Sequence, residues 1–234
     1  MRLFRLSERL AACASLVRPG ARLADVGSDH ALLPVWLAKN GMISGGVATD
    51  ISPNATKKAA ENIAKYGVAH LLKAETAHGF DSLNPDEVDD IVIAGMGGEL
   101  MGRILGCACV NHEWLKNPHY NLILQPMSHP ERLRSALVSG GFEIRREIAV
   151  REGRRIYLVI QARYSGEEAK IHPYIGRLDE NSDEASRDSL LRQAQLLRLE
   201  AGGAEKRGET VWAQDLKSTA DEMESAANRM KIIG

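Results

Sequence analysis

The chain has 234 residues, of which 44% are hydrophobic and 26% charged, and its formal net charge is −1 at pH 7. These values are ordinary for globular proteins and exclude both a disordered chain and a strongly basic nucleic-acid-binding composition. No uninterrupted apolar run approaches the roughly 20 residues that span a bilayer, and charges interrupt the segment where a secretory signal would have its apolar core. Three cysteines are too few for a disulfide framework. We therefore expect a soluble, cytoplasmic protein without membrane contacts.

Helical and extended patterns alternate along the first two thirds of the chain. In chain order they predict a helix over 6–17, a strand over 22–26, a helix over 32–39, a strand over 46–50, a helix over 53–66, strands over 69–73 and 88–94, a helix over 98–105, a strand over 120–124, a helix over 130–138, and strands over 142–150 and 154–162. Strands that alternate with helices indicate a parallel, doubly wound sheet. The last two strands face each other across a turn at Gly153 and predict an antiparallel hairpin.

The composition changes after residue 163. Apolar residues at helical spacing predict two helices, over 185–201 and 210–232, joined by a turn at Gly202-Gly203. We therefore expect an α/β fold in two domains. Residues 1–163 form a Rossmann-like class I methyltransferase sheet, parallel with a terminal antiparallel hairpin, and residues 164–234 form a C-terminal, coiled-coil-like α-helical hairpin. This hairpin either packs on itself or on a second copy, giving a monomer or weak dimer, or it grips a large substrate.

Acidic residues follow the first two strands in a pattern that suits a sulfonium cofactor. Asp25, Ser28 and Asp29 surround Gly27, where the missing side chain lets the backbone approach a ligand, and Asp50 ends the second strand. The G-x-G-x-x-G dinucleotide fingerprint is absent, whereas S-adenosylmethionine carries no phosphate and has an ammonium that carboxylates can bind. Asp50 is placed to accept hydrogen bonds from the ribose hydroxyls. The alternative for each acid is helix capping or turn formation.

Glycines and an amide follow the next two strands. The run Gly95-Met96-Gly97-Gly98 leaves room for a flat ring and offers N–H donors, so we expect a target base to lie there. Gln125 ends the following strand, and its amide can both donate to and accept from a base edge. The alternatives are that the glycines only form turns and that Gln125 only ties loops together.

Two further clusters lie outside this edge. Cys107 and Cys109 with His112 lack the second pair of ligands that a structural zinc site requires, so we expect no metal. Arginines crowd the segment around the hairpin turn and either contact RNA phosphates or form a solvated face. Those expected to bind the substrate are Arg145, Arg146, Arg154 and Arg155.

Three strings of residues resemble one family. They are Gly27-Ser28-Asp29-His30-Ala31 followed by Leu33-Pro34, Ile93-Ala94-Gly95-Met96-Gly97-Gly98, and Leu122-Ile123-Leu124-Gln125-Pro126. In order and spacing they are similar to the bacterial tRNA adenine N1-methyltransferases of the TrmK type, which modify adenine 22 of tRNA. The resemblance implies S-adenosyl-L-methionine as cofactor and tRNA as partner. Three positions depart from the family pattern, at Leu32, Met127 and the turn 75–78.

The resemblance also assigns roles to individual residues. Asp29 would stabilise the cationic product adenine, with Gln125 orienting the base. The positions implied for the cofactor are Asp25, Gly27, Ser28, His30, Asp50, Ile51, Thr76 and Gly95. The positions implied for the base are Met96, Gly97, Gly98 and Pro126. Two alternatives remain: a non-catalytic adaptor that binds S-adenosylmethionine, and a methyltransferase with a different RNA or a small-molecule target.

Overall fold

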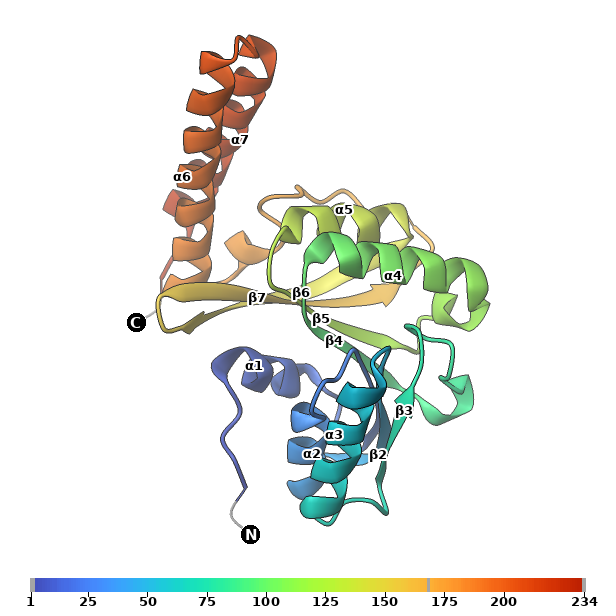
Figure 1. Cartoon of the computed structure of the whole chain (residues 1–234). Helices are drawn as coiled ribbons and strands as arrows, with labels where there is room; N and C mark the ends of the chain where they lie inside the picture. The colour runs from blue at the N-terminus through green and yellow to red at the C-terminus, as the bar shows by residue number, and fades with distance from the viewer. Residues whose placement is uncertain (1–2, 168, 233–234) are drawn as a thin grey trace.

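One seven-stranded sheet organises the first part of the molecule, as a computed structural model that describes residues 3–167 and 169–232 makes clear (Figure 1). The strand order is β3-β2-β1-β4-β5-β7-β6. Strands β1 to β5 are parallel, and β7 joins β5 in the antiparallel sense, which confirms the predicted class I methyltransferase sheet. The strands are β1 Ala21–Val26, β2 Ile43–Asp50, β3 Leu72–Thr76, β4 Asp90–Met96, β5 Asn121–Pro126, β6 Phe142–Glu152 and β7 Arg155–Tyr164.

Helices cover both faces of this sheet. On one face lie α1 Glu8–Leu16, α2 Leu32–Lys39 and α3 Pro53–Lys65, whose apolar residues share a core with Leu23, Val92 and Ile123. On the other face lie α4 Gly98–Asn111 and α5 Pro130–Ser139, which pack on the opposite side chains of the same strands. Because both faces are buried, the central strands are continuously apolar. Short 3₁₀ turns occur at Pro85–Glu87, Glu113–Lys116 and Leu178–Glu180.

The third strand begins three residues later than the sequence pattern predicts. The chain from Val68 to Leu71 instead closes a turn after α3, in which the N–H groups of Leu71 and Leu72 donate to the Val68 carbonyl. Leu72 then pairs with Gly46, and Thr76 pairs with Asp50. This correction matters for the site, because it carries Thr76 to the carboxyl edge of the sheet beside Asp50.

The C-terminal helices α6 Glu184–Lys206 and α7 Thr210–Arg229 form an antiparallel pair with a core of their own (Figure 1). The predicted turn at Gly202-Gly203 is wrong, because α6 continues through both glycines. Each glycine costs about 1 kcal/mol in a helix, but the flanking Ala201 and Ala204 are fully buried in the pair. The chain turns instead at Gly208, where the N–H of Glu209 donates to the Ala204 carbonyl at 3.0 Å in a Schellman motif. Within 3–167 and 169–232, no helix combines the length and apolar character needed to cross a membrane.

A buried ion pair joins the connector before α6 to the sheet. Arg134 of α5 donates from Nε to Glu147 of β6 at 2.7 Å, and both side chains are almost completely buried. Arg134 also donates to the carbonyls of Pro173 and Tyr174, while Arg177 donates its backbone N–H to Glu147. The connector is therefore held at a fixed place on β6, which orients the helical pair relative to the sheet.

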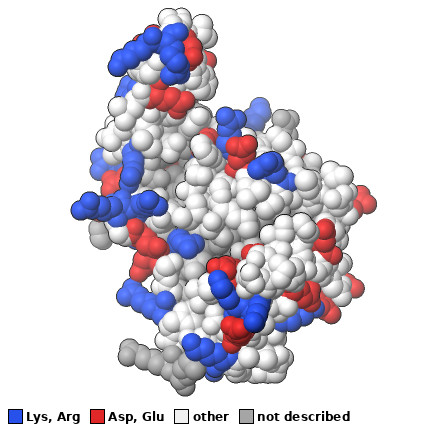
Figure 2. Space-filling model, viewed as in Figure 1, with Lys and Arg blue, Asp and Glu red and all other residues white. Residues whose placement is uncertain are grey.

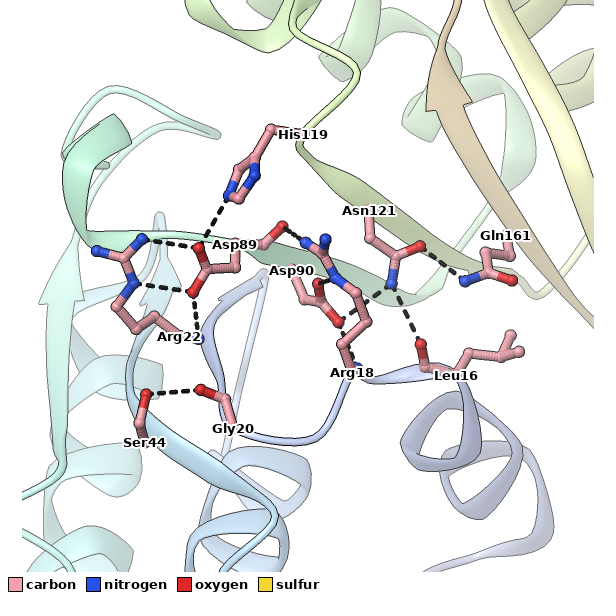
Figure 3. Close-up of polar contacts among 10 residues, drawn as sticks. All are labelled: Leu16, Arg18, Gly20, Arg22, Ser44, Asp89, Asp90, His119, Asn121 and Gln161. Atoms are coloured by element: carbon pink, nitrogen blue, oxygen red, sulfur yellow. Dashed lines mark hydrogen bonds and ion pairs between the residues drawn. The ribbon is translucent and has the colours of Figure 1, made fainter.

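A second polar network holds α1 at the amino edge of the sheet (Figure 3). Arg18, just after the helix, pairs with the fully buried Asp90 at 2.6 Å. Asn121 donates from Nδ2 to both Asp90 and the Leu16 carbonyl, and accepts from Gln161. The carboxyl end of α1 is thus tied to β4, β5 and β7, which places the other end of this helix over the opposite edge.

Candidate functional site

The turn after β1 holds a buried carboxylate. Asp25 accepts a hydrogen bond of 2.5 Å from the Ser28 hydroxyl. Burial raises the pKa of Asp25 to about 6, although the Ser28 hydrogen bond opposes the shift. The N–H groups of Gly27 and Ser28 both donate to the Thr49 carbonyl of β2, which fixes the turn. A buried carboxylate with a raised pKa is a strong attractor for a cation, because a positive ligand would offset its desolvation.

A larger residue at Gly27 would strain the backbone and displace the end of the Met96 side chain. The φ of Gly27 is +79°, and a Cβ at this position would overlap the terminal methyl group of Met96. Met96 ends β4, the strand next to β1, so its side chain covers the β1 turn. The predicted cofactor turn and the predicted base-binding run are therefore in direct contact.

The ends of β2 and β3 add hydroxyl and carboxylate groups. Asp50 accepts from the Ser52 N–H with one carboxylate oxygen, and the other has no hydrogen-bond partner among the described residues. The hydroxyls of Thr76 and Thr56 lie 2.8 Å apart, and the Ala77 N–H donates to the Asp50 carbonyl. One oxygen of Asp50 therefore remains available for a ligand at this edge.

Asp29 lies further out than Asp25. Its side chain is 60% exposed and pairs with His30 at 3.1 Å and with Lys58 of α3 at 3.8 Å. The backbone here is held by Asn62, which donates to the His30 carbonyl, and by Ala31, which has a positive φ of 51° before α2. Exposed ion pairs are weak, so Asp29 can exchange these partners for a ligand.

The glycine run after β4 divides into an open and a closed part. Gly95 is exposed, has a φ of +86° and lies at the register shift between β4 and β5. Gly98 is buried so closely against the next loop that a Cβ there would overlap the His129 carbonyl, and its N–H donates to the Ser128 carbonyl at 2.7 Å. The Met127 N–H donates to the Met96 carbonyl, so the two loops form one ledge. Of the predicted base-binding glycines, Gly95 and Gly97 are the less buried ones.

Gln125 is fully buried and both ends of its amide are engaged. Its Nε2 donates to the Pro126 carbonyl at 2.9 Å and lies 3.7 Å from the Met127 sulfur. Its Oε1 accepts at 2.9 Å from Arg9 of α1, a residue to which the sequence motifs assign no role. A signal for Arg9 did exist, because it lies four residues before the buried Cys13 and so shares the inward face of the predicted helix.

Large apolar side chains are exposed around this edge. Each follows a strand that ends here or begins a helix that starts here, and their exposed fractions lie between 38% and 61%. They are Leu32, Ile51, Leu100 and Met127. Exposed large apolar side chains that surround polar groups are typical of a ligand-binding surface.

The arginines of the β6–β7 hairpin separate into two groups. Arg146 pairs in register with Gln161, level with Ile123 in the middle of β5, and the neighbouring Arg145 is bound to Glu143 at 2.7 Å. The other pair is at the hairpin turn, beyond the carboxyl edge, where Lys and Arg side chains gather at the base of the helical pair (Figure 2). That pair is Arg154 and Arg155.

A cavity of about 390 Å³ lies between this hairpin turn and α6. Its walls come from the loop after β5, from the first residues of β7 and from the middle of α6. Arg155 faces it without an ion-pair partner among the described residues, and Arg192 of α6 donates to the Arg154 carbonyl. The cavity therefore joins the loop of Met127 to a cationic wall.

The cysteines take no part in this edge. Cys107 is exposed and Cys109 partly buried on α4, and Cys13 is a buried residue of α1. In the part of the chain that the structure describes, no group of three or more His, Cys, Asp or Glu side chains could hold a metal ion.

Comparisons with known proteins agree with this geometry. The model of a family described as "Methyltransferase domain" matches residues 6–160. A Bacillus subtilis (strain 168) tRNA (adenine(22)-N(1))-methyltransferase is 32% identical over 158 residues, which cover 68% of this chain and 65% of that protein. The alignment thus spans slightly less than two thirds of the relative.

Solved structures extend the likeness to almost the whole chain. The crystal structure of the B. subtilis m1A22 tRNA methyltransferase TrmK superposes with a TM-score of 0.82 at 25% identity, covering 97% of this chain and 98% of that one. A Streptococcus pneumoniae protein, described as a candidate tRNA (m1A22) methyltransferase and solved with S-adenosyl-L-methionine, superposes with a TM-score of 0.80 at 28% identity, covering 94% of this chain and 100% of that one.

Proposed function

The chain belongs to the methyltransferase-domain family and, within it, to the bacterial tRNA (adenine-22 N1)-methyltransferases of the TrmK type, and we propose on this basis that it methylates tRNA. It would transfer a methyl group from S-adenosyl-L-methionine to N1 of an adenine, at position 22 by family resemblance. The observation that carries the proposal is the pair of carboxylates at the ends of β1 and β2, with the glycine ledge of β4 beside them. We also propose that this activity takes place in the cytoplasm, where a tRNA substrate would be met.

The residues at the edge fit the proposed cofactor. Asp25 would receive the ammonium, whose positive charge offsets the cost of burying the carboxylate. The unpartnered oxygen of Asp50 would accept from the ribose hydroxyls. Ile51 and Thr76 would flank the adenine, and the backbone of Gly27, Ser28, His30 and Gly95 would line the remainder. When bound, the sulfonium supplies the methyl group.

The protein's part in the transfer is alignment and charge stabilisation. N1 of adenine already carries a lone pair, so no covalent enzyme intermediate is needed, and nitrogen and methyl carbon must be held in line at about 3–3.5 Å. Met96, Gly97, Gly98 and Pro126 would hold the base. Gln125 would fix this ledge through its hydrogen bond to the Pro126 carbonyl. The product adenine is cationic, and Asp29 would stabilise the developing charge.

The proposed tRNA surface lies beside this ledge. The target base must leave its stack to reach the edge, so the neighbouring phosphates must be held outside it. Arg154 and Arg155 are at the correct edge for this role, and the cavity next to Arg155 connects the ledge to α6. Arg145 and Arg146 would contact phosphates further from the target. We accordingly propose a division into a catalytic domain, residues 1–163, and a helical extension, residues 164–234.

The test is a transfer assay with labelled S-adenosylmethionine and undermodified bulk tRNA, followed by digestion and a search for 1-methyladenosine. We expect label in 1-methyladenosine, and strongly reduced turnover with unchanged cofactor affinity for Asp29→Ala. Asp81→Ala is the matched control, because Asp81 is also exposed and paired with a histidine but lies away from this edge. Label on another atom would indicate a different specificity. Cofactor binding without any transfer would favour the non-catalytic adaptor.

A further inference from the structure

Helix α6 has two different stripes of residues along its length. The first stripe is buried in the core of the helical pair and includes Leu190, Ala194 and Leu197. The second stripe lines the cavity beside the β6–β7 hairpin turn, and its residues are three or four positions apart, so they lie on one face of the helix. They are Ser189, Arg192, Gln193 and Leu196. This second face is turned toward the sheet and is not used to hold the helical pair together.

The cavity is present because β7 separates from β5 at the carboxyl edge of the sheet. The last paired residues there are Leu124 of β5 and Ile160 of β7. Beyond them β5 continues to Pro126, while the part of β7 that starts at Arg155 has no β5 residue beside it. The space between them is closed by α6 and has a volume of about 390 Å³. Sites for small organic groups have volumes of about 300–1,000 Å³.

The walls of this cavity are cationic. Arg155 and Arg192 both line it, and neither forms an ion pair with an acid among the described residues. Arg192 donates from Nη1 to the Arg154 carbonyl, which leaves its other N–H groups available. The acid on the wall is Glu131, which is already paired with Nδ1 of His129 at 3.0 Å. The cavity therefore favours an anionic group such as a phosphodiester.

Apolar side chains and one amide complete the walls. Met127 lies in the loop after β5 and is 40% exposed, and Leu196 of α6 is 53% exposed. Gln193 is half-buried, and its amide has no hydrogen-bond partner among the described residues. A nucleobase has apolar faces and an edge of donors and acceptors, which an amide can match because it both donates and accepts. The same cavity thus offers groups for a phosphate and groups for a base.

We propose that this cavity holds the nucleotide next to the target adenine in the RNA. Its base lies against Met127 and Leu196, and Gln193 binds the edge of this base. Its phosphate is bound by Arg155 and Arg192. The proposal rests on the proposed function. When a target base leaves its stack, its neighbour loses a stacking partner, and a cavity that begins at the ledge of the target can take up this neighbour.

The walls favour a nucleotide of an RNA chain over a free nucleotide. A free nucleoside diphosphate or triphosphate is usually held by the N–H groups of a glycine-rich loop. No glycine occurs among the described residues that line this cavity. Two arginines suit the single charge of a phosphodiester, and the cationic surface continues outside the cavity at the base of the helical pair, where an RNA chain can follow it (Figure 2).

The experiment uses tRNA in which the nucleotide on the 5′ or the 3′ side of the methylated adenine is abasic, so that sugar and phosphate remain and only the base is missing. The kcat and KM of methyl transfer are measured with intact and abasic tRNA for the wild type, Gln193→Leu, Leu196→Ala and Arg192→Gln. Matched controls on α6 are Leu199→Ala and Arg187→Gln, because both residues are exposed and lie outside the cavity. Calorimetry with S-adenosylmethionine and circular dichroism show that each variant keeps its cofactor affinity and its fold.

An abasic nucleotide on one side of the target should raise the KM of the wild type about tenfold. Gln193→Leu should raise the KM for intact tRNA about fivefold and then respond only about twofold to the missing base, and Leu196→Ala should change in the same direction. Arg192→Gln should weaken both tRNAs alike and reduce the slope of log K for tRNA binding against log salt concentration by about 0.9. The two control variants should behave as the wild type.

Two results would contradict the assignment of this cavity. If a missing base on either side costs the wild type nothing, or costs the wild type and Gln193→Leu the same, the cavity does not hold the neighbouring base, although methyl transfer by the wild type still supports the proposed function. If the wild type transfers no methyl group to any tRNA, the proposed function and the assignment of the cavity are both wrong.

Discussion

Replacing Asp25 by Asn should stabilise the ligand-free protein while it weakens cofactor binding. Burial raises the pKa of Asp25 from 3.8 to about 6. Between these two pH values the folded state binds more protons than the unfolded state, so the stability contribution of Asp25 falls as the pH rises through this window. Above pH 6 the full cost of a buried, ionised carboxylate is present. At about 1.4 kcal/mol for each pKa unit, that cost is about 3 kcal/mol.

Asn removes this cost and keeps the local hydrogen bond. Its side-chain oxygen can still accept from the Ser28 hydroxyl, which donates to Asp25 in the wild type. The free energy of unfolding at pH 7.5 should therefore increase by up to about 3 kcal/mol, and the difference between variant and wild type should shrink as the pH approaches 4. In the wild type, cofactor affinity should rise between pH 5 and pH 7 as Asp25 ionises, and Asp25→Asn should remove this dependence.

Urea unfolding followed by tryptophan fluorescence at several pH values measures the stability difference. Asp29→Asn is the control, since Asp29 is 60% exposed and its replacement should change stability by no more than about 0.5 kcal/mol. An Asp25→Asn protein that is less stable at pH 7.5, with an unchanged denaturant slope, would refute the reasoning. So would a stability gain of the same size at every pH.

Three further predictions concern packing and charge in the site and in the connector before α6. Gly27→Ala should cost more stability than Gly67→Ala. Both positions have a positive φ, which costs about 1–2 kcal/mol for alanine, but only at Gly27 would the new methyl group meet Met96. Equal urea midpoints for the two variants would show that Met96 moves aside. Glu147→Gln should destabilise the protein by about 3 kcal/mol or more, since Arg134 loses its buried counterion. Glu143→Gln is the control, because it breaks a more exposed ion pair and should cost less than about 1 kcal/mol. The double variant Arg154→Ala/Arg155→Ala should reduce the slope of log K for tRNA binding against log salt concentration by about 0.9 for each phosphate that is no longer neutralised. Arg145→Ala should reduce this slope less. An unchanged slope in the double variant would assign Arg154 and Arg155 to a solvated face.

Local patterns were sufficient for most of the elements and for the motifs at their ends. The continuous apolar run of β4 and the glycine and proline residues at element boundaries depend on neighbours in the chain, so they could be read without the fold. Where distant contacts decide, the same patterns failed. The two glycines in α6 remain helical because Ala201 and Ala204 pack against α7, and β3 begins at Leu72 because its partner Gly46 sets the register.

The alternation of strands and helices, and the order of carboxylates and glycines along the sheet, follow from the chain alone, because turn chemistry and hydrophobic periodicity are local properties. Three features of the site follow only from the folded molecule: Arg9 reaches Gln125 from α1, Met96 covers Gly27, and the arginines around the hairpin divide between the middle of the sheet and its carboxyl edge. Each of these depends on how strands pair and where a helix docks, and those contacts join residues that lie far apart in the chain.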